Sequence, residues 1–324
     1  MILVVLCHSV AFYGGDWFTV CGFEQKNIYL GSLASWLGTF HVEAFTLISG
    51  YVYYFIKQEK QGYNKYSVFL LNKIKRLLVP YFAMSLLWVI PLSNTYYDYS
   101  CKDIIHKYLL GESPSQLWFL LMLFNVFVIA DAIISWLGRK IQMICVLVIF
   151  LASVILTRMV PNTFQILTSM RYLMFFYIGY ILRMKCPMME SKKYFILGGG
   201  FLLLNLVSFV YSNIFFKPIH TRVFIFVCKN VCDISGAIMA FMLLSGIASK
   251  FKAVNQVSKL FENISFPIYL FHQQIIYIML WHFVTKLPPF FMCCVCFIVS
   301  LIVSYLISEI LVKNKYSRFL IGLK

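Results

Sequence analysis

Ionisable side chains inside long apolar runs are the first feature of this sequence that could do chemistry. The stretch FHVEAFTLISGY over residues 40–51 places a histidine and a glutamate two positions apart. Such groups are costly in hydrocarbon, so each needs a partner or a function. The ionisable residues found in apolar runs are His8, His41, Glu43, Asp131, Arg171, Lys229, Asp233 and His272.

The histidines are the candidates for acid–base chemistry, because neutral imidazole is a base near pH 7. His8, beside Ser9 in the first run, is the strongest of them; the alternative is a hydrogen bond between helices. For His272, which follows a proline that loosens a helix, a structural role is favoured. His41 and Glu43 lie about 200° apart on a helix, so they cannot both face one cavity.

The buried charges have both plain and functional interpretations. Arg171 is costly to bury unless it meets an anion, which could be Glu43 or a phosphate. Lys229 and Asp233 are four residues apart on a helix and are expected to neutralise each other. The basic segment 57–76 is explained most simply by topology and by anionic lipid headgroups, and alternatively by docking of a polyanionic donor such as coenzyme A.

The elements that position these residues must lie in lipid. The chain has 324 residues, of which 61% are hydrophobic and 12% charged, and its mean hydropathy is +0.81. A soluble domain of this length would carry roughly twice that charged fraction. Because apolar runs recur along the whole chain, we expect one integral membrane domain over residues 1–324.

About ten helical spans are predicted, since only helices or closed barrels satisfy the backbone in lipid. The fold class is therefore an all-α, polytopic membrane bundle. The first run is too short to cross a bilayer, so we expect the first helix to be truncated at its N-terminus. The predicted spans are 1–13, 29–56, 77–92, 117–137, 141–157, 166–183, 194–212, 223–248, 264–284 and 289–312.

The distribution of basic residues predicts the orientation. The connections after the even-numbered spans and the C-terminal tail hold nineteen lysines and arginines, and the opposite connections hold seven. The positive-inside rule therefore predicts that both termini are cytoplasmic. The net charge of +16 follows topology and does not indicate nucleic-acid binding. The cysteines at 293, 294 and 296 lack partners at zinc-ligand spacing, so no metal site is expected.

Six motifs in a fixed order carry a resemblance to a known family. They are LVVLCHS, FHVEAFTLISGYVYY, NKIKRLLVPY, LWFLLMLF, MRYLMFFYIGYIL and ISFPIYLFHQQI. This order resembles the membrane-bound acyltransferase family 3, which includes O-acetyltransferases of bacterial surface polysaccharides and the fucose 4-O-acetylase-like group. The resemblance spans nearly the whole chain and implies a bundle of about ten helices.

The resemblance also implies which residues act. The family's histidine at the end of the first motif corresponds to His8, and its acidic residue before the SGY motif corresponds to Glu43. The remaining positions that match family motifs are Ser49, Gly50, Trp118, Phe119 and His272. Two departures stand out: Cys7 occupies a usual glycine position, and only seven residues precede His8, whereas the family places a basic residue ten or eleven positions before this histidine.

The activity that the resemblance implies is transfer of an acetyl or similar acyl group from cytosolic acetyl-CoA to a sugar hydroxyl. The acceptor would be a cell-surface or capsular polysaccharide or its lipid-linked precursor, and no permanently bound cofactor is expected. His8 would act as a general base or form an acyl-histidine. Glu43 would orient a neighbouring histidine or Arg171, and Lys73, Lys75 and Arg76 would contact coenzyme A phosphates.

The resemblance implies a bacterial cytoplasmic (inner) membrane as the location, where we expect the protein to contact membrane lipids. The rival interpretation is a secondary transporter or flippase for a glycan or lipid-linked substrate, because charges at the membrane midplane suit transport equally well.

Overall fold

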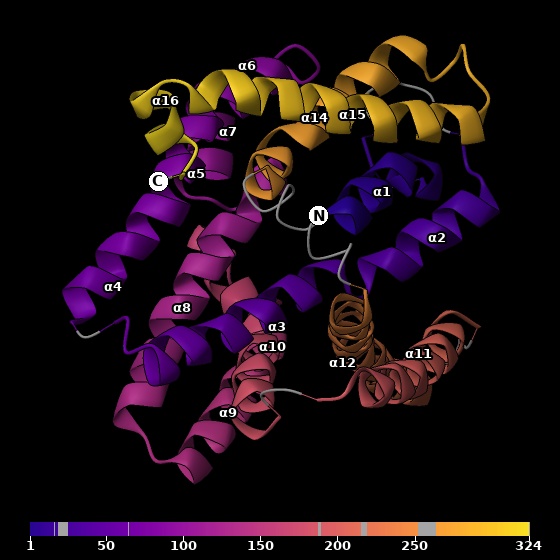
Figure 1. Cartoon of the computed structure of the whole chain (residues 1–324). Coiled ribbons are helices and arrows are strands. Elements are labelled where there is room, and N and C mark those ends of the chain that lie inside the picture. The colour runs from indigo at the N-terminus through magenta and orange to yellow at the C-terminus, as the bar shows by residue number, and fades with distance from the viewer. Residues whose placement is uncertain are drawn as a thin grey trace. The chain divides into compact units, whose positions relative to one another are not determined.

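A computed structural model describes residues 1–15, 17–18, 25–63, 65–186, 189–214, 219–251 and 264–323, with side chains for all of these except 214 and 219–222 (Figure 1). All regular structure in these residues is helical, and they contain no strand. Six stretches are long and apolar enough to cross a membrane, namely 66–93, 115–136, 139–156, 191–213, 223–250 and 289–312. The all-α, polytopic membrane fold is confirmed.

Most predicted spans coincide with a helix to within a few residues. The hydropathy of the chain therefore determines where the helices lie, because a run of apolar residues in lipid must satisfy its own backbone hydrogen bonds. These helices are α1 (Ile2–Ala11), α8 (Trp118–Trp136), α9 (Arg139–Leu156), α10 (Ile166–Lys185), α11 (Ser191–Ile214), α12 (Ile219–Lys250), α14 (Ser265–Phe283) and α15 (Pro289–Val312).

The predicted span 29–56 is wrong in one respect, because it consists of two helices. Helix α2 (Ile28–Gly38) ends at a glycine, and α3 (His41–Tyr54) begins after a turn at Thr39 and Phe40. The Thr39 hydroxyl donates to the carbonyl of Trp36, 2.8 Å away, and so caps the end of α2. His41 is consequently the first residue of a helix and does not lie inside a continuous one.

The helical segment that covers the predicted span 77–92 is longer than expected and has an irregular backbone. Helical structure runs from Tyr66 to Ser93. Two of its segments are π-helical, and prolines follow both, at positions 80 and 91. A wider turn accommodates the carbonyls that proline leaves without a donor. The segments are α4 (Tyr66–Lys73), η4 (Ile74–Leu78), α5 (Val79–Met84), η5 (Ser85–Val89) and α6 (Ile90–Ser93).

Several short elements lie largely outside the predicted spans. A π-helical turn, η3 (Phe55–Glu59), continues α3, and α16 (Lys315–Leu320) follows α15. The loop 93–116 contains α7 (Cys101–Ile104) and η6 (Ile105–Leu109). Ser100 and Asp103 form a reciprocal capping box that starts α7. Hydrogen bonds from Ser100 also hold the pKa of the Asp103 carboxyl below its usual range.

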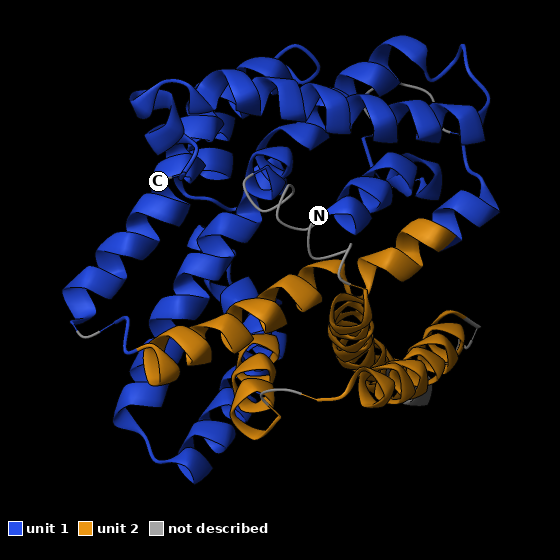
Figure 2. Ribbon diagram, viewed as in Figure 1, with its two compact units in different colours: residues 1–32, 61–174, 262–324 blue, residues 33–60, 175–261 orange. Residues whose placement is uncertain are grey.

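The chain divides into two compact units (Figure 2). Unit 1 comprises residues 1–32, 61–174 and 262–324, and within it α14 packs along α15 while α1 contacts both. Unit 2 comprises residues 33–60 and 175–261, and within it α11 packs along α12, which also contacts α3. The expectation of a single domain over residues 1–324 stays a prediction.

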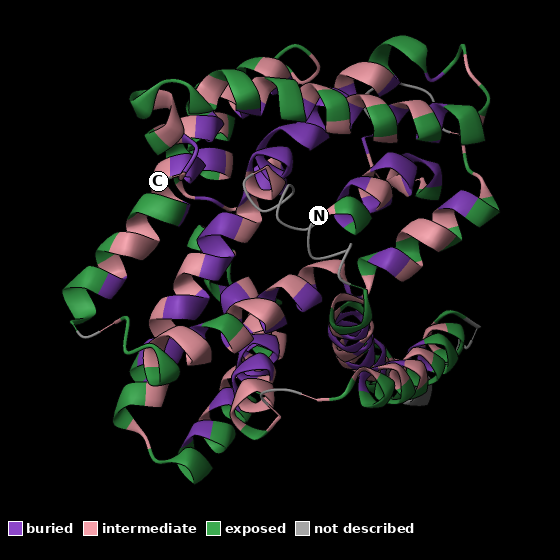
Figure 3. Ribbon diagram, viewed as in Figure 1, coloured by how far each residue is buried: buried purple, intermediate pink, exposed green. Residues whose placement is uncertain are grey.

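Helices α9, α11 and α15 have many exposed residues, as Figure 3 shows. Among them are long apolar side chains. On α15, Phe290, Ile298 and Ile310 are more than half exposed, whereas the small side chains of Ser300 and Ser304 on its other face are fully buried. Small residues let neighbouring helices approach closely, and apolar residues that no helix covers suit lipid. These three helices therefore have the faces expected of a membrane bundle.

Within unit 2, α3 and the second half of α10 touch at backbone distance through two glycines. A methyl group on Gly50 would overlap the carbonyl oxygen of Phe176, and one on Gly179 would overlap that of Leu47. The glycine of the SGY motif is thus required by helix packing. In the GGG run of α11, Gly198 faces Leu243, whereas a methyl on Gly199 would meet no atom within 4 Å.

We predict that Gly50→Ala destabilises the protein by about 1–3 kcal/mol, because the two backbones must move apart. Gly199→Ala is the matched control, and it should leave stability unchanged or raise it, since alanine is the better helix former. Thermal unfolding of both variants in detergent measures the difference. Equal unfolding temperatures for Gly50→Ala and Gly199→Ala would contradict this packing.

Candidate functional site

Two histidines that are 264 residues apart in the sequence meet in unit 1. Nδ1 of His8, on α1, lies 2.8 Å from Nε2 of His272, on α14. The two rings are stacked, with centroids 5.0 Å apart and an angle of 15° between their planes. The structure therefore brings together the two histidines that the sequence motifs indicated.

Backbone carbonyls fix the proton on His272. Its Nδ1 lies 2.9 Å from the carbonyl oxygen of Ile268 and 3.0 Å from that of Tyr269. Carbonyl oxygens only accept, so Nδ1 of His272 must carry a hydrogen. In the neutral ring Nε2 is then the acceptor, and Nδ1–H of His8 donates to it. Neutral His8 is thereby left with Nε2 as its basic nitrogen.

The two rings differ in exposure. His272 is fully buried, whereas His8 is only partly buried. The ring of Trp17 lies 5.6 Å from that of His8 and 4.8 Å from that of Tyr277, so aromatic side chains line this place. Of the two rings, His8 therefore keeps exposed surface, whereas His272 is enclosed and holds His8 through their hydrogen bond.

Helix α14 is anchored by a short 3-10 turn, η7 (Ser115–Leu117). The amide Nε2 of Gln116 donates to the carbonyl of Leu270 at 3.1 Å, and the hydroxyl of Tyr269 donates to the carbonyl of Gln116. Nε2 of Gln273 donates to the hydroxyl of Ser115 at 3.1 Å. Ser115 itself has a positive φ of 51°, a conformation that costs a non-glycine residue free energy. This turn therefore holds the segment that carries His272.

Pro267 does not loosen α14, contrary to the expectation from the sequence. The helix is continuous from Ser265 to Phe283, and Pro267 is its third residue. Proline is tolerated in the first turn because the backbone donors there lack helical partners in any case. The side chain of His272 therefore reaches back to carbonyls of the preceding helical turn, and no break in the helix is needed to supply them.

Trp118 and Arg171 lie together at another place in unit 1. They line a cavity of about 340 Å³ with Thr157, which follows α9, and with residues of the turn 162–165 and of α10. Trp118 and Tyr172 have ring centroids 5.8 Å apart. Phe119, beside Trp118, points its edge at Tyr269, with centroids 5.8 Å apart.

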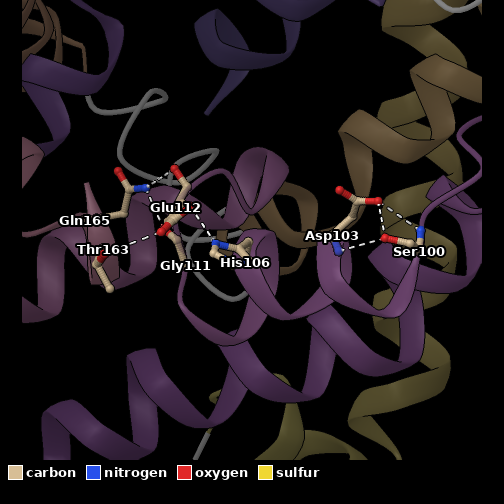
Figure 4. Close-up of polar contacts among 7 residues, drawn as sticks. All are labelled: Ser100, Asp103, His106, Gly111, Glu112, Thr163 and Gln165. Atoms are coloured by element: carbon tan, nitrogen blue, oxygen red, sulfur yellow. Dashed lines mark hydrogen bonds and ion pairs between the residues drawn. The ribbon is translucent and has the colours of Figure 1, made fainter. Parts of the chain in front are cut away.

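Loops from two parts of the chain are joined near this cavity, as Figure 4 shows. The buried amide of Gln165, in the turn η8 (Thr163–Gln165), donates to the carbonyls of Gly111 at 2.7 Å and Glu112 at 3.0 Å. Glu112 in turn lies 3.3 Å from His106. A polar network therefore fixes the loop 105–116 to the start of α10.

The three basic candidates for donor binding lie on helix and not in a loop. Lys73 ends α4, and its Nζ lies 3.3 Å from the ring centroid of Phe127 and 5.5 Å from that of Tyr63. This cation is half-buried against aromatic faces. Lys75 and Arg76 lie on η4, and both are exposed. Only these last two have the exposure that a phosphate contact requires.

Glu43 and Ser49 belong to unit 2. Glu43 is buried in the first turn of α3, where the helix dipole favours a negative charge. The hydroxyl of Ser49 donates to the carbonyl of Phe45 at 2.9 Å, one turn earlier on the same helix. The pairing of Glu43 with Arg171 or with a histidine stays a prediction.

The family assignment follows from comparison with known sequences. The profile of the family described as "Acyltransferase domain" matches residues 1–309, nearly the whole chain. The chain belongs to this family. Membership of the acyltransferase family 3 makes the protein a membrane acyltransferase and favours the enzyme over the transporter or flippase. No curated protein and no solved structure matches the chain significantly.

Sequence reasoning missed the residues that support the histidine pair. Tyr269, Gln273 and Gln116 are buried, and Trp17 borders His8. The polar triplet at 272–274 inside an apolar span was a usable signal, because amides at membrane depth must find partners. Trp17 gave no such signal, because a tryptophan near the end of an apolar run is ordinary.

We predict that Gln165→Leu lowers the free energy of unfolding by about 1–3 kcal/mol, because two buried carbonyls lose their donor. Gln58→Leu, at an exposed position on η3, is the control for the same chemical change and should have little effect. Thermal unfolding in detergent compares the two. If Gln165→Leu unfolds at the parental temperature, the loop network does not stabilise the fold.

Proposed function

We propose that the protein transfers an acetyl group from acetyl-CoA to a sugar hydroxyl, with His8 as the general base. The acceptor class is a cell-surface or capsular polysaccharide, or its lipid-linked precursor. The observation that carries the proposal is the hydrogen bond between Nδ1 of His8 and Nε2 of His272 in a chain of the acyltransferase family.

The arrangement of protons on the two rings supports a direct transfer. Nε2 of His8 accepts the hydroxyl proton as the sugar oxygen attacks the thioester carbonyl carbon. The carbon–sulfur bond then breaks, and the coenzyme A thiolate takes the proton back from His8. Throughout this cycle Nδ1–H of His8 keeps donating to His272, so the ring does not turn. The backbone carbonyls at Ile268 and Tyr269 keep His272 in the required tautomer.

The same nitrogen also supports transfer in two steps. Nε2 of His8 attacks the thioester carbon and expels the coenzyme A thiolate, which leaves an N-acetylimidazolium that keeps its Nδ1–H. The sugar hydroxyl then attacks this acetyl group, its proton passes to the coenzyme A thiolate, and neutral His8 is released. In both routes His8 reacts and His272 is a positioning residue.

The donor is expected to reach the enzyme from the cytosol. Coenzyme A is polyanionic, and exposed Lys75 and Arg76 on η4 offer it two cations. The positive-inside distribution supports a cytoplasmic position for this segment and for both termini, in a bacterial inner membrane. Lys73, engaged with aromatic rings, is a weaker candidate for this contact than its two neighbours.

We predict that His8→Ala lowers the rate of acetyl transfer by at least about 100-fold, because the general base is lost. The measurement is release of free coenzyme A from acetyl-CoA by purified protein with added host glycan, together with mass spectrometry of the glycan. His282→Ala is the matched control, since His282 is exposed on α14 and should be dispensable.

His272 tests the positioning role separately. His272→Gln should retain more activity than His272→Leu, because the amide oxygen of glutamine can accept from Nδ1–H of His8 whereas leucine cannot. A folded His8→Ala protein that acetylates glycan at the parental rate would remove the proposal. Equal loss in both His272 variants, with His8→Ala inactive, would remove only the role given to His272.

A further inference from the structure

The cavity beside Trp118 is a site that the acyl-transfer chemistry does not use. Its volume of about 340 Å³ is within the range of small-molecule pockets. Neither His8 nor His272 is among its described lining residues. These are Trp118, Thr157, Asn162, Gln165, Leu167, Thr168, Arg171 and Tyr172.

The lining has the chemistry that a sugar ring requires. The faces of aromatic rings such as Trp118 and Tyr172 carry partial negative charge and attract the C–H groups of a pyranose. The hydroxyls of Thr157 and Thr168 already donate to neighbouring protein oxygens, at 2.6 Å and 2.9 Å, so they can only accept hydrogen bonds from sugar hydroxyls. Arg171 is the one charged residue among the described lining, and guanidinium binds carboxylate and phosphate in a planar, two-bonded geometry.

The cavity wall is held rigidly. The amide Nδ2 of Asn162 donates to Oγ1 of Thr168 at 2.6 Å, and its Oδ1 accepts from the backbone N–H of Leu167 at 3.0 Å. Phe164 and Gln165 both have positive φ, of 51° and 57°. Strained backbone of this kind persists only where the surroundings hold it, and it is concentrated at binding sites. A preformed wall lowers the entropy cost of binding.

A series of ring contacts leads from the cavity to the histidine pair. Beyond Tyr172 and Trp118, the centroid of Phe119 lies 6.2 Å from that of Trp118 and 5.8 Å from that of Tyr269. The centroid of Tyr269 lies 6.4 Å from that of His272. The cavity is therefore separated from the histidine pair by several residues, and the rings of these residues are in contact from one end of the series to the other.

We propose that this cavity binds an acidic sugar unit of the acceptor, a pyranose that bears a carboxylate or a phosphate, while a different unit of the same glycan is acetylated at His8. The identity of the acceptor rests on the proposed function. Binding energy from such a remote unit can be used to orient the reacting hydroxyl. The topology expected from the basic residues places the cavity at the outer face, where surface glycans are.

The test is the affinity of the full-length protein in detergent for D-glucuronate, D-glucose 1-phosphate and D-glucose, measured by ligand-observed NMR titration. At least one acidic sugar should bind about tenfold more tightly than glucose or better, as expected of hydrogen bonds to a charged partner. Arg171→Met should abolish this preference, and Arg171→Lys should retain part of it. The two acidic probes distinguish a carboxylate from a phosphate.

A second variant covers the case in which Arg171→Met does not fold. Thr157→Trp fills the cavity from an exposed position and should remove binding of all three sugars. Equal affinities for acidic and neutral sugars, a preference that survives in Arg171→Met, or unchanged binding by Thr157→Trp would each overturn the inference. Binding without acetyl transfer would contradict only the proposed function, and transfer without the binding preference would contradict only this inference.

Discussion

The account depends on one constraint, the direction of the hydrogen bond between His8 and His272. The fully buried imidazole of His272 cannot change its tautomer freely, because every polar group in an apolar bundle must keep its hydrogen-bond partners. Two backbone carbonyls accept from one side of His272, so its other nitrogen can only accept in the neutral ring. The basic nitrogen of His8 is thereby set by the backbone of α14.

Several irregular parts of the backbone lie beside the candidate residues. The turn between α2 and α3 precedes His41 and Glu43, and the π-helical segment η4 carries Lys75 and Arg76. Ser115 and Gln165 have positive φ, and they anchor α14 and border the cavity, respectively. Irregular backbone at membrane depth is tolerated only where protein or a polar cavity satisfies it. Several departures from regular helix therefore occur at residues with a polar or positioning role.

The positions of the helices could be predicted from the sequence, because mean hydropathy over about 20 residues is a property of the local chain. The start of the third span at Tyr66 could not be predicted, since the residues before position 77 include several polar ones that lower the local hydropathy. The break at Thr39 and Phe40 was also missed, although Gly38 at the end of α2 is a readable sign of a helix end. Ser100 and Asp103 did give a readable sign, the spacing of a capping box.

The candidate site was predictable only in part. His8 and His272 could each be singled out as imidazoles in apolar runs, but their contact joins positions that hydropathy cannot relate. The aromatic surroundings of Lys73 depend on Phe127, which is on another helix. The cavity at Arg171 depends on where the start of α8, the turn after α9 and the start of α10 meet, which is determined by packing. Local patterns thus identified residue types, and the tertiary structure determined their partners.

The most direct test of the central claim is the protonation pattern of the two rings. Solid-state NMR of ¹⁵N-histidine-labelled protein in lipid bilayers at about pH 8, where free imidazole is neutral, reports which nitrogen of each ring carries hydrogen. Spectra of His8→Ala and His272→Gln assign the signals. The account predicts that both rings carry hydrogen on Nδ1 and none on Nε2. A hydrogen on Nε2 of neutral His272 would contradict it, because His8 would then have to accept at Nδ1 and could not be the base described here.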